Sequence, residues 1–263
     1  MAVHPTAVVS PEARLGEGVA VGPFAVVESE TSIGEWTQIR AHAVVKRHTR
    51  LGARNVVHEG AVLGGEPQDV GFEDVPTALA IGDANRIREG VTIHRASSPG
   101  GATVVGSECF LMAGAHVAHD CRLGDGVLLA NNVALAGHVT IGDRAFLSGG
   151  VVVHQFCRIG RLAMIGGNSK VVQDCLPFVI TDGVPARARG LNIVGLRRAG
   201  MGAADLRALK EAYRLLLRAA LPLEETLGRM AGLQHPLAQE MAAFVRASKR
   251  GVTRAKRSGE AAE

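Results

Sequence analysis

Four histidines lie between residues 111 and 156, and two of them stand beside a polar residue. His116, His119, His138 and His154 fall in this stretch, with Asp120 after His119 and Gln155 after His154. A neutral histidine near pH 7 can take the proton of a substrate hydroxyl, and an adjacent carboxylate can fix its tautomer. These residue types therefore suit acyl transfer to a hydroxyl group, provided that the fold brings them together.

A six-residue repeat of aliphatic positions supplies the scaffold. It runs over residues 3–63, 81–93 and 105–171, and a glycine follows the aliphatic residue at intervals of eighteen. Three hexads therefore make one coil, each hexad being a short strand and a turn, which predicts a parallel β-helix of triangular section. Coils should rise by roughly 4.8 Å, the spacing of hydrogen-bonded strands.

Two segments interrupt the repeat, and the last part of the chain has a different period. Residues 64–80 and 95–104 are rich in Gly, Pro and charge, which predicts loops. After Val171 the chain reads as an extended exit, and from about Ala203 the apolar period is helical, with Pro222 and Pro236 able to open further helices. We predict a mainly β chain, with a β-helix over residues 1–190 and an α-helical domain over residues 191–263.

Composition narrows the function classes. The net charge of +4 and the pI of about 9.1 favour acidic partners. The sequence contains no basic stripe interleaved with aromatic residues of the kind that binds nucleic acid. It also contains no apolar run of the kind that forms a membrane span or a signal peptide, so we expect a cytoplasmic protein. The cysteines occupy small inward positions and read as buried hydrophobes rather than ligands: Cys109, Cys121, Cys157 and Cys175.

The eighteen-residue coil predicts which polar residues stack. His119 should lie one coil below Gly137, and Gly137 one coil below Gln155, while Asp120 should lie one coil below His138. The Gly137 N–H could then meet a developing oxyanion. Because the cysteines point inward and no serine nucleophile is indicated, direct transfer is favoured over an acyl-enzyme.

A zinc site is the rival hypothesis, since γ-class carbonic anhydrases hold zinc on this architecture. That family uses a His-x4-His pair and a third histidine, whereas His116 and His119 form His-x2-His. Asp120 and Gln155 also suit a sugar better than a metal, so we expect none. A non-catalytic scaffold is a third possibility, disfavoured by the clustering of polar residues on one face.

His94 joins this face, one coil below, if the second loop replaces whole hexads.

Several segments together resemble one family. They are HPTA, the loop residues QD, IGDANRIREGVTIHR, AHVAHDC, LANNVALAGHV, VHQF and GLNIVGLRR. With these the chain resembles the UDP-N-acetylglucosamine O-acyltransferases that begin lipid A synthesis in Gram-negative bacteria. The resemblance implies a left-handed β-helix, a homotrimer with active sites between subunits, and transfer of an (R)-3-hydroxyacyl chain from acyl carrier protein to the glucosamine 3-hydroxyl. No cofactor is implied beyond the phosphopantetheine of the carrier.

The same resemblance assigns roles to residues. His119 would be the general base, Asp120 its partner and Gly137 the oxyanion donor. Arg198 would meet the diphosphate of the nucleotide and Gly167 would stand where the acyl-chain length is limited. The full set of implied substrate-binding residues is Gln68, Asp69, His94, His116, His138, His154, Gln155, Gly167, Asn192 and Arg198.

Two departures from the family pattern affect the expected substrate. Gly71 and Ala199 stand where the family usually has basic residues. Acyl transfer to a 3-amino UDP-sugar is therefore an alternative, and Gly167 leaves room for a longer acyl chain. Arg198 could equally be a solvent-facing charge, and Asp69 a carboxylate that caps a turn.

Overall fold

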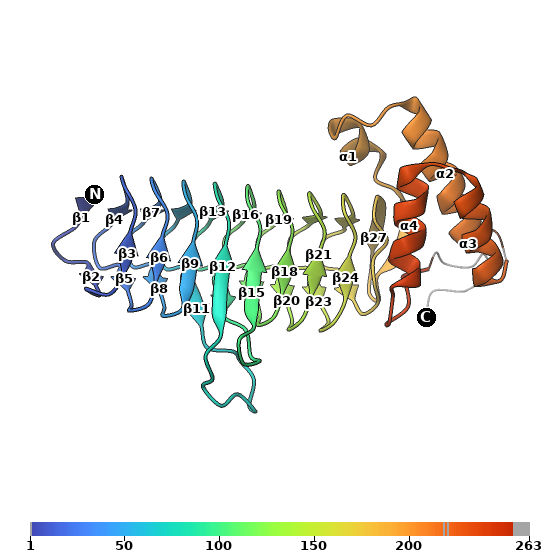
Figure 1. Ribbon diagram of the computed structural model, residues 1–263. Coiled ribbons are helices and arrows are strands. Elements are labelled where there is room, and N and C mark those ends of the chain that lie inside the picture. Colours follow the sequence, from blue (N-terminus) through green and yellow to red (C-terminus); the bar gives the residue numbers. More distant parts are fainter. Residues whose placement is uncertain (1, 218, 220, 255–263) are drawn as a thin grey trace.

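The computed structural model describes residues 2–254 apart from 218 and 220, and in it the hexads wind into an elongated β-helix that ends in helices (Figure 1). Strands eighteen residues apart pair in parallel, so that Val117 partners Leu135 and Leu135 partners Val153. Where a loop intervenes, the partners lie further apart in sequence, as for Ile93 and Val117.

Three sheets form the sides of the helix. The first sheet contains β1 (Ala2–Val3), β4 (Ala20–Val21), β7 (Gln38–Ile39), β10 (Val56–Val57), β13 (Arg86–Ile87), β16 (Phe110–Leu111), β19 (Leu128–Leu129), β22 (Phe146–Leu147), β25 (Met164–Ile165), β27 (Val179–Asp182) and β28 (Arg187–Leu191). The second sheet contains β2 (Val8–Val9), β5 (Val26–Val27), β8 (Val44–Val45), β11 (Val62–Gly65), β14 (Thr92–His94), β17 (His116–Val117), β20 (Ala134–Leu135), β23 (Val152–Val153) and β26 (Lys170–Val171). The third sheet contains β3 (Arg14–Leu15), β6 (Ser32–Ile33), β9 (Thr49–Leu51), β12 (Ala78–Ile81), β15 (Ala102–Val105), β18 (Arg122–Leu123), β21 (Thr140–Ile141) and β24 (Arg158–Ile159).

The glycines that recur along the repeat lie at the corner between the third and first sheets, where a neighbouring coil occupies the space of a side chain. A Cβ placed on Gly106 would meet the Asp125 carboxylate at 2.5 Å and the Gly124 backbone at 2.6 Å. Asp125 uses that space to accept the Ser107 N–H at 2.7 Å, and Asp143 accepts the Asp125 N–H at 3.0 Å. These successive coils are thus tied together by aspartates whose carboxylates occupy the space that a glycine leaves open.

The interior holds the repeated aliphatic residues and the cysteines. Every cysteine is a buried free thiol, as its position in the hexad predicts. Burial is the main cause that raises the pKa of Cys109 and Cys157 to about 11 and that of Cys121 to about 12, and it raises the pKa of Cys175 as well. These thiols are therefore poor nucleophiles.

The two loops leave the same corner and are shorter than the ranges expected from the sequence. They run over residues 66–77 and 95–101, because Gly65 pairs with His94 and the whole of β12 pairs with β15. The first loop projects from the side of the helix (Figure 1). Its Asp74 accepts a hydrogen bond of 2.6 Å from the buried Arg95 guanidinium, which binds the two loops together.

Beyond the repeat, the described residues form a hairpin and four helices. β27 and β28 pair antiparallel, so the expected extended exit turns back on itself. Helices α2 (Ala203–Leu217), α3 (Leu223–Gly232) and α4 (Pro236–Arg246) match the apolar period read from the sequence, whereas α1 (Ile193–Arg198) is a six-residue helix that was not predicted. Within the described ranges, no helix is long and apolar enough to cross a membrane.

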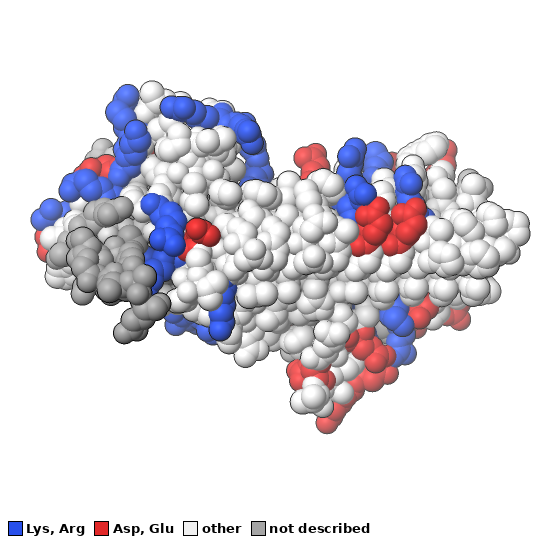
Figure 2. Space-filling view, turned by 180° about the vertical axis from the view of Figure 1, so that it is seen from behind, with Lys and Arg blue, Asp and Glu red and all other residues white. Residues whose placement is uncertain are grey.

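Buried contacts fasten the helices to the last coils. The Asp174 carboxylate, 1% exposed, accepts hydrogen bonds of 2.8 Å from the Arg158 N–H and the Ser248 hydroxyl. Arg161 pairs with Glu240 through two hydrogen bonds of 2.8 and 3.1 Å. In the face shown in Figure 2, lysines and arginines gather over the helical end, while acidic side chains gather on the projecting loop.

Candidate active site

The histidines gather at the corner where the second sheet passes to the third. The His138 N–H donates to the His119 carbonyl at 3.0 Å, and the Phe156 N–H donates to the Gly137 carbonyl at 3.1 Å. Consecutive coils therefore stack in the order that the eighteen-residue spacing predicts. Both long loops leave this same corner from β11 and β14, two coils and one coil below His119.

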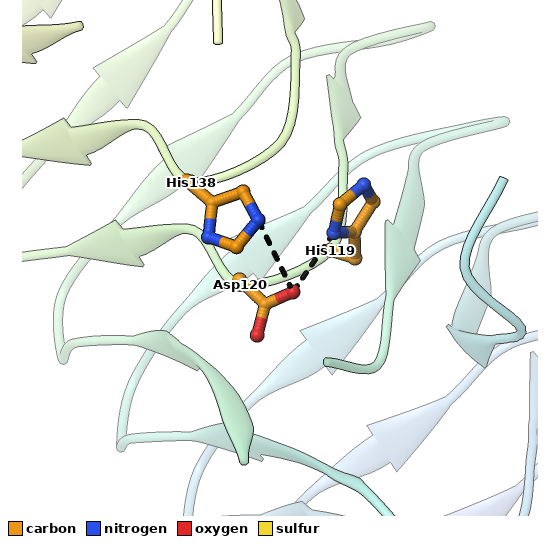
Figure 3. Close-up of side chains that lie close together, drawn as sticks. All are labelled: His119, Asp120 and His138. Atoms are coloured by element: carbon orange, nitrogen blue, oxygen red, sulfur yellow. Dashed lines mark hydrogen bonds and ion pairs between the residues drawn. The ribbon is translucent and has the colours of Figure 1, made fainter. Parts of the chain in front are cut away.

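His119 and Asp120 form a hydrogen-bonded pair (Figure 3). The His119 Nδ1 lies 2.8 Å from the Asp120 Oδ2, and the two side chains are 14% and 13% exposed. Because Nδ1 faces the carboxylate, it carries the proton and Nε2 is left with a free lone pair. The pair thus presents one basic nitrogen in a largely desolvated corner.

Gly137 lies directly against the His119 ring. A Cβ at this position would stand 2.6 Å from the ring Cε1 and 2.7 Å from Nε2, so any side chain here would displace the imidazole. In the part of the chain that the structure describes, no carbonyl or side chain accepts the Gly137 N–H. Glycine at this position therefore leaves both room for the ring and a free donor beside it.

The Asp120 carboxylate has partners beyond His119. Its Oδ2 accepts the Ser97 hydroxyl at 2.7 Å and the Ser97 N–H at 3.0 Å, and lies 3.8 Å from the His138 Nε2. Burial opposes ionisation of Asp120, but the hydrogen bonds from His119 and Ser97 outweigh it and lower the pKa of the carboxyl. Asp120 is therefore favoured as an anion beside the His119 ring.

Ser97 and Phe156 complete the corner, and the sequence analysis missed both. The His138 ring stands edge-on to His119, with centroids 5.2 Å apart, and stacks on Phe156 at 4.5 Å with an interplanar angle of 12°. The spacing of eighteen between His138 and Phe156 could have indicated that stack. Ser97 carried no such signal, because it lies in a loop whose path the repeat does not determine.

His94 and His116 form a second pair at the lower edge of the corner. Ile93 pairs with Val117, so the loop does replace whole hexads and His94 lies one coil below. The rings of His94 and His116 are 5.2 Å apart, and the His116 Nδ1 lies 2.8 Å from the Thr92 hydroxyl. Burial, followed by the charge of His94, lowers the pKa of His116, which favours its neutral form.

His154 and Gln155 are exposed at the upper edge of the corner. The His154 Nδ1 lies 3.1 Å from the Gln155 carbonyl, and no other side-chain partner of either residue is present among residues 2–254 apart from the two gaps. Both side chains are free to contact a substrate.

No hydrogen bond within the described residues joins the remaining predicted residues to the histidines. Asp69 caps its own turn by accepting the Gly71 N–H at 3.0 Å, and Gln68 beside it is exposed. Gly167 lies at a different corner, after β25 of the first sheet. Asn192 caps α1 by accepting the Gly195 N–H at 3.1 Å, and the exposed Arg198 ends that helix.

Comparison with known proteins identifies the family to which this architecture belongs. Residues 174–253 match the family described as "Udp N-acetylglucosamine O-acyltransferase; Domain 2", and residues 102–137 match "Bacterial transferase hexapeptide (six repeats)". The acyl-[acyl-carrier-protein]–UDP-N-acetylglucosamine O-acyltransferase of Alkalilimnicola ehrlichii is 46% identical over 255 residues, covering 96% of this chain and 99% of that protein. The chain belongs to this acyltransferase family. The enzyme of the same name from Burkholderia orbicola is 43% identical over 259 residues, again covering 96% and 99%.

Solved structures of UDP-N-acetylglucosamine acyltransferases superpose on nearly the whole chain. The Moraxella catarrhalis enzyme gives a TM-score of 0.94 at 40% identity, covering 97% of this chain and 100% of that one. The Bacteroides fragilis enzyme gives 0.92 at 36% identity, covering 95% and 99%. These likenesses confirm the predicted left-handed β-helix with a C-terminal helical domain, and they confirm acyl transfer in lipid A synthesis over the alternatives of a zinc hydratase and an N-acyltransferase.

The acyltransferase corner nonetheless contains donors of the kind that metals use. One donor atom from each of His119, Asp120 and His138 lies within 4.8 Å of the others, and a second such group comprises His58, Glu59 and Glu89. Asp120 already accepts hydrogen bonds from Ser97 and His119. In the second group a bidentate pair with Arg88 is the main cause that lowers the pKa of Glu89 to about 2. Asp120 and Glu89 thus have hydrogen-bond donors in place of a cation.

Proposed function

We propose that His119 is the general base of this acyltransferase, acting on the 3-hydroxyl of UDP-N-acetylglucosamine. The observation that carries the proposal is the His119–Asp120 hydrogen bond of 2.8 Å, which leaves Nε2 free beside Gly137. Proton removal by a positioned histidine contributes on the order of 10²–10⁴ in rate. The carboxylate holds the imidazole in the required tautomer and stabilises the imidazolium that forms.

The reaction then proceeds in one ternary complex. The 3-hydroxyl oxygen attacks the thioester carbonyl of the (R)-3-hydroxyacyl-phosphopantetheine while its proton moves to the His119 Nε2. The carbonyl oxygen becomes an oxyanion, for which the Gly137 N–H is the proposed donor. Collapse of the tetrahedral intermediate expels the phosphopantetheine thiolate, which takes the proton back from His119 and leaves the ester.

Direct transfer is favoured because the cysteines are unsuited to form an acyl-enzyme. Their thiols are buried and their pKa values are raised. The proposed chemistry needs no bound cofactor, since the acyl group arrives already activated as a thioester on acyl carrier protein. His94, His116, His138, His154 and Gln155 are proposed to line the acceptor and acyl sites along the same corner.

A homotrimer is proposed from the outward side chains of the three sheets. The first sheet carries a half-buried apolar column, Phe110, Leu128, Phe146 and Met164. The second sheet carries a mostly apolar column, Val44, Val62, Ala134 and the exposed Val152, with Thr92 and His116 between Val62 and Ala134. The third sheet instead presents arginines, Arg14, Arg50, Arg122 and Arg158. Packing the first sheet of one copy on the second sheet of the next would cover both columns and close a ring.

The trimer would also bring the remote residues to the site. Gly167, Asn192 and Arg198 lie toward the first sheet and the helices, so a neighbouring copy would present them to the histidine corner. Gln68 and Asp69, on the projecting loop that leaves the histidine corner, are proposed to contact the acceptor as well. Arg198 is exposed at the end of α1 and is proposed to meet the diphosphate.

The test is the His119→Ala variant, assayed for acyl transfer from (R)-3-hydroxyacyl carrier protein to UDP-N-acetylglucosamine. We expect kcat to fall by about 10³-fold, with the melting temperature unchanged, because the side chain lies at an outward position of the coil. His4→Ala, at the exposed first coil, is the matched control and should retain full activity. A His119→Ala enzyme within tenfold of the wild type would overturn the assignment.

A further inference from the structure

Ser97 bonds to the carboxylate oxygen that holds His119. Its hydroxyl donates to the Asp120 Oδ2 at 2.7 Å and its N–H donates to the same atom at 3.0 Å, while the His119 Nδ1 lies 2.8 Å from it. We infer that Ser97 is a positioning residue of the acyl transfer: it fixes the Asp120 carboxylate so that His119 keeps its tautomer and orientation. The inference rests on the proposed role of His119 as general base.

The Asp120 carboxylate needs this support because it could turn from His119 toward another partner, His138. Asp120 lies in a turn with a φ of 60°, its backbone N–H tied to the Thr103 hydroxyl at 2.8 Å, but rotation about its terminal bond is broad. The His138 Nε2, 3.8 Å from Oδ2, competes with His119 for the same oxygen. No lysine or arginine of the described chain pairs with Asp120, so Ser97 supplies its neutral donors.

The loop that carries Ser97 is itself held firmly on both sides. The Arg95 N–H donates to the Gly65 carbonyl at 2.9 Å, and the Ala96 N–H to the Ala78 carbonyl at 3.2 Å. The Gly101 N–H closes the loop on the Ser98 carbonyl at 2.8 Å, and a Cβ at Gly101 would collide with that carbonyl. Ser97 is thus presented to Asp120 by a loop whose backbone is hydrogen-bonded on both sides of it, as positioning requires.

A nucleophilic role for Ser97 fits the geometry less well. Its hydroxyl proton points at the Asp120 carboxylate, and the basic Nε2 of His119 lies on the other side of the ring, against Gly137. An activated serine would instead share its proton with that nitrogen. This geometry therefore favours a role for Ser97 in supporting the base over acylation of its hydroxyl.

The experiment compares Ser97→Ala and Ser97→Thr with Ser98→Ala as the matched control. Ser98 is an exposed neighbour whose hydroxyl makes no hydrogen bond within the described residues. We expect Ser97→Ala to lower kcat by about 10–100-fold, the usual effect of losing such outer support, with KM for both substrates within about twofold. Ser97→Thr retains the hydroxyl and should restore most of the rate, and Ser98→Ala should match the wild type.

A double-mutant cycle separates positioning from a general effect on the fold. In an Asp120→Ala background, Ser97→Ala should cost no further activity, because Ser97 acts through that carboxylate. A wild-type kcat in Ser97→Ala, or an equal loss in both backgrounds, would overturn the inference. So would an acyl adduct on Ser97 in the mass spectrum of enzyme mixed with acyl carrier protein alone. The His119→Ala result is a separate test. An active His119→Ala enzyme would refute the proposed general base, whereas an unchanged kcat in Ser97→Ala would refute only the inference about Ser97.

Discussion

Gly137→Ala tests the geometry of the corner with a single methyl group. The added Cβ would stand 2.6 Å from the His119 Cε1, whereas carbon atoms pack at about 3.5 Å or more, so the ring must move by about 1 Å. That movement breaks the alignment of the His119–Asp120 hydrogen bond. A misplacement of about 1 Å in a reacting group can cost about 10²-fold in rate, or about 2.7 kcal/mol in the activation free energy.

The same substitution should spare the fold. Gly137 does not adopt a positive φ, so alanine fits its backbone and tends to reduce the entropy of the unfolded chain. We expect kcat to fall about 10²-fold while the melting temperature is unchanged, measured by the transfer assay and by scanning calorimetry.

Gly228→Ala, in α3 with open space around its Cβ, is the control and should not change kcat. The Gly137→Ala variant keeps the backbone N–H, so a lower kcat in this variant would come from displacement of the His119 ring alone. An unaltered kcat would refute the claim that this space positions the base.

Three further predictions concern other parts of the molecule. Asp174→Ala should lower the free energy of unfolding by about 3 kcal/mol in a urea titration, because it leaves the buried Arg158 N–H unpaired and releases Ser248 from the last coil; an unchanged midpoint would contradict this. Asp74→Asn should raise KM for the UDP-sugar about tenfold with kcat retained, because the loop that carries Asp69 loses its charged pairing with Arg95; equal losses in kcat and kcat/KM would argue against a binding role. The cysteines should resist a thiol reagent at pH 8 until the chain unfolds, and labelling of the folded enzyme would show that the core opens.

The sequence predicts the parts of this molecule that the repeat determines. Once the coil length of eighteen is known, the neighbours of a corner residue follow wherever no loop intervenes, so the stacking of His119 on Gly137 can be predicted from the sequence. The inward cysteines follow from the same count. Helices α2 to α4 were predictable because their apolar stripes are long, whereas α1 has six residues, one of them Gly195, and no complete stripe.

What the sequence could not supply lies where the repeat stops. The hydrogen bonds from Ser97 to Asp120 depend on the path of residues 95–101, and the pairing of Asp74 with Arg95 depends on how two loops meet. No periodicity constrains either path.

The position of the two loops gives a structural reason for proposing the chemistry at this corner and not at the other two. A regular corner is a tight turn whose side chains stack vertically, so it can hold a ring in place but cannot bring a donor to it from the side. The insertions at residues 66–77 and 95–101 leave this corner on the two coils beneath His119. The second supplies Ser97 to Asp120, and Arg95 at its start anchors the first. The rigid coils thus determine where the base lies, while the loops provide the lateral contacts that a hexad cannot. Shortening the loop 95–101 to a regular turn would therefore preserve the coil and the His119–Gly137 stack, yet remove the support of the carboxylate.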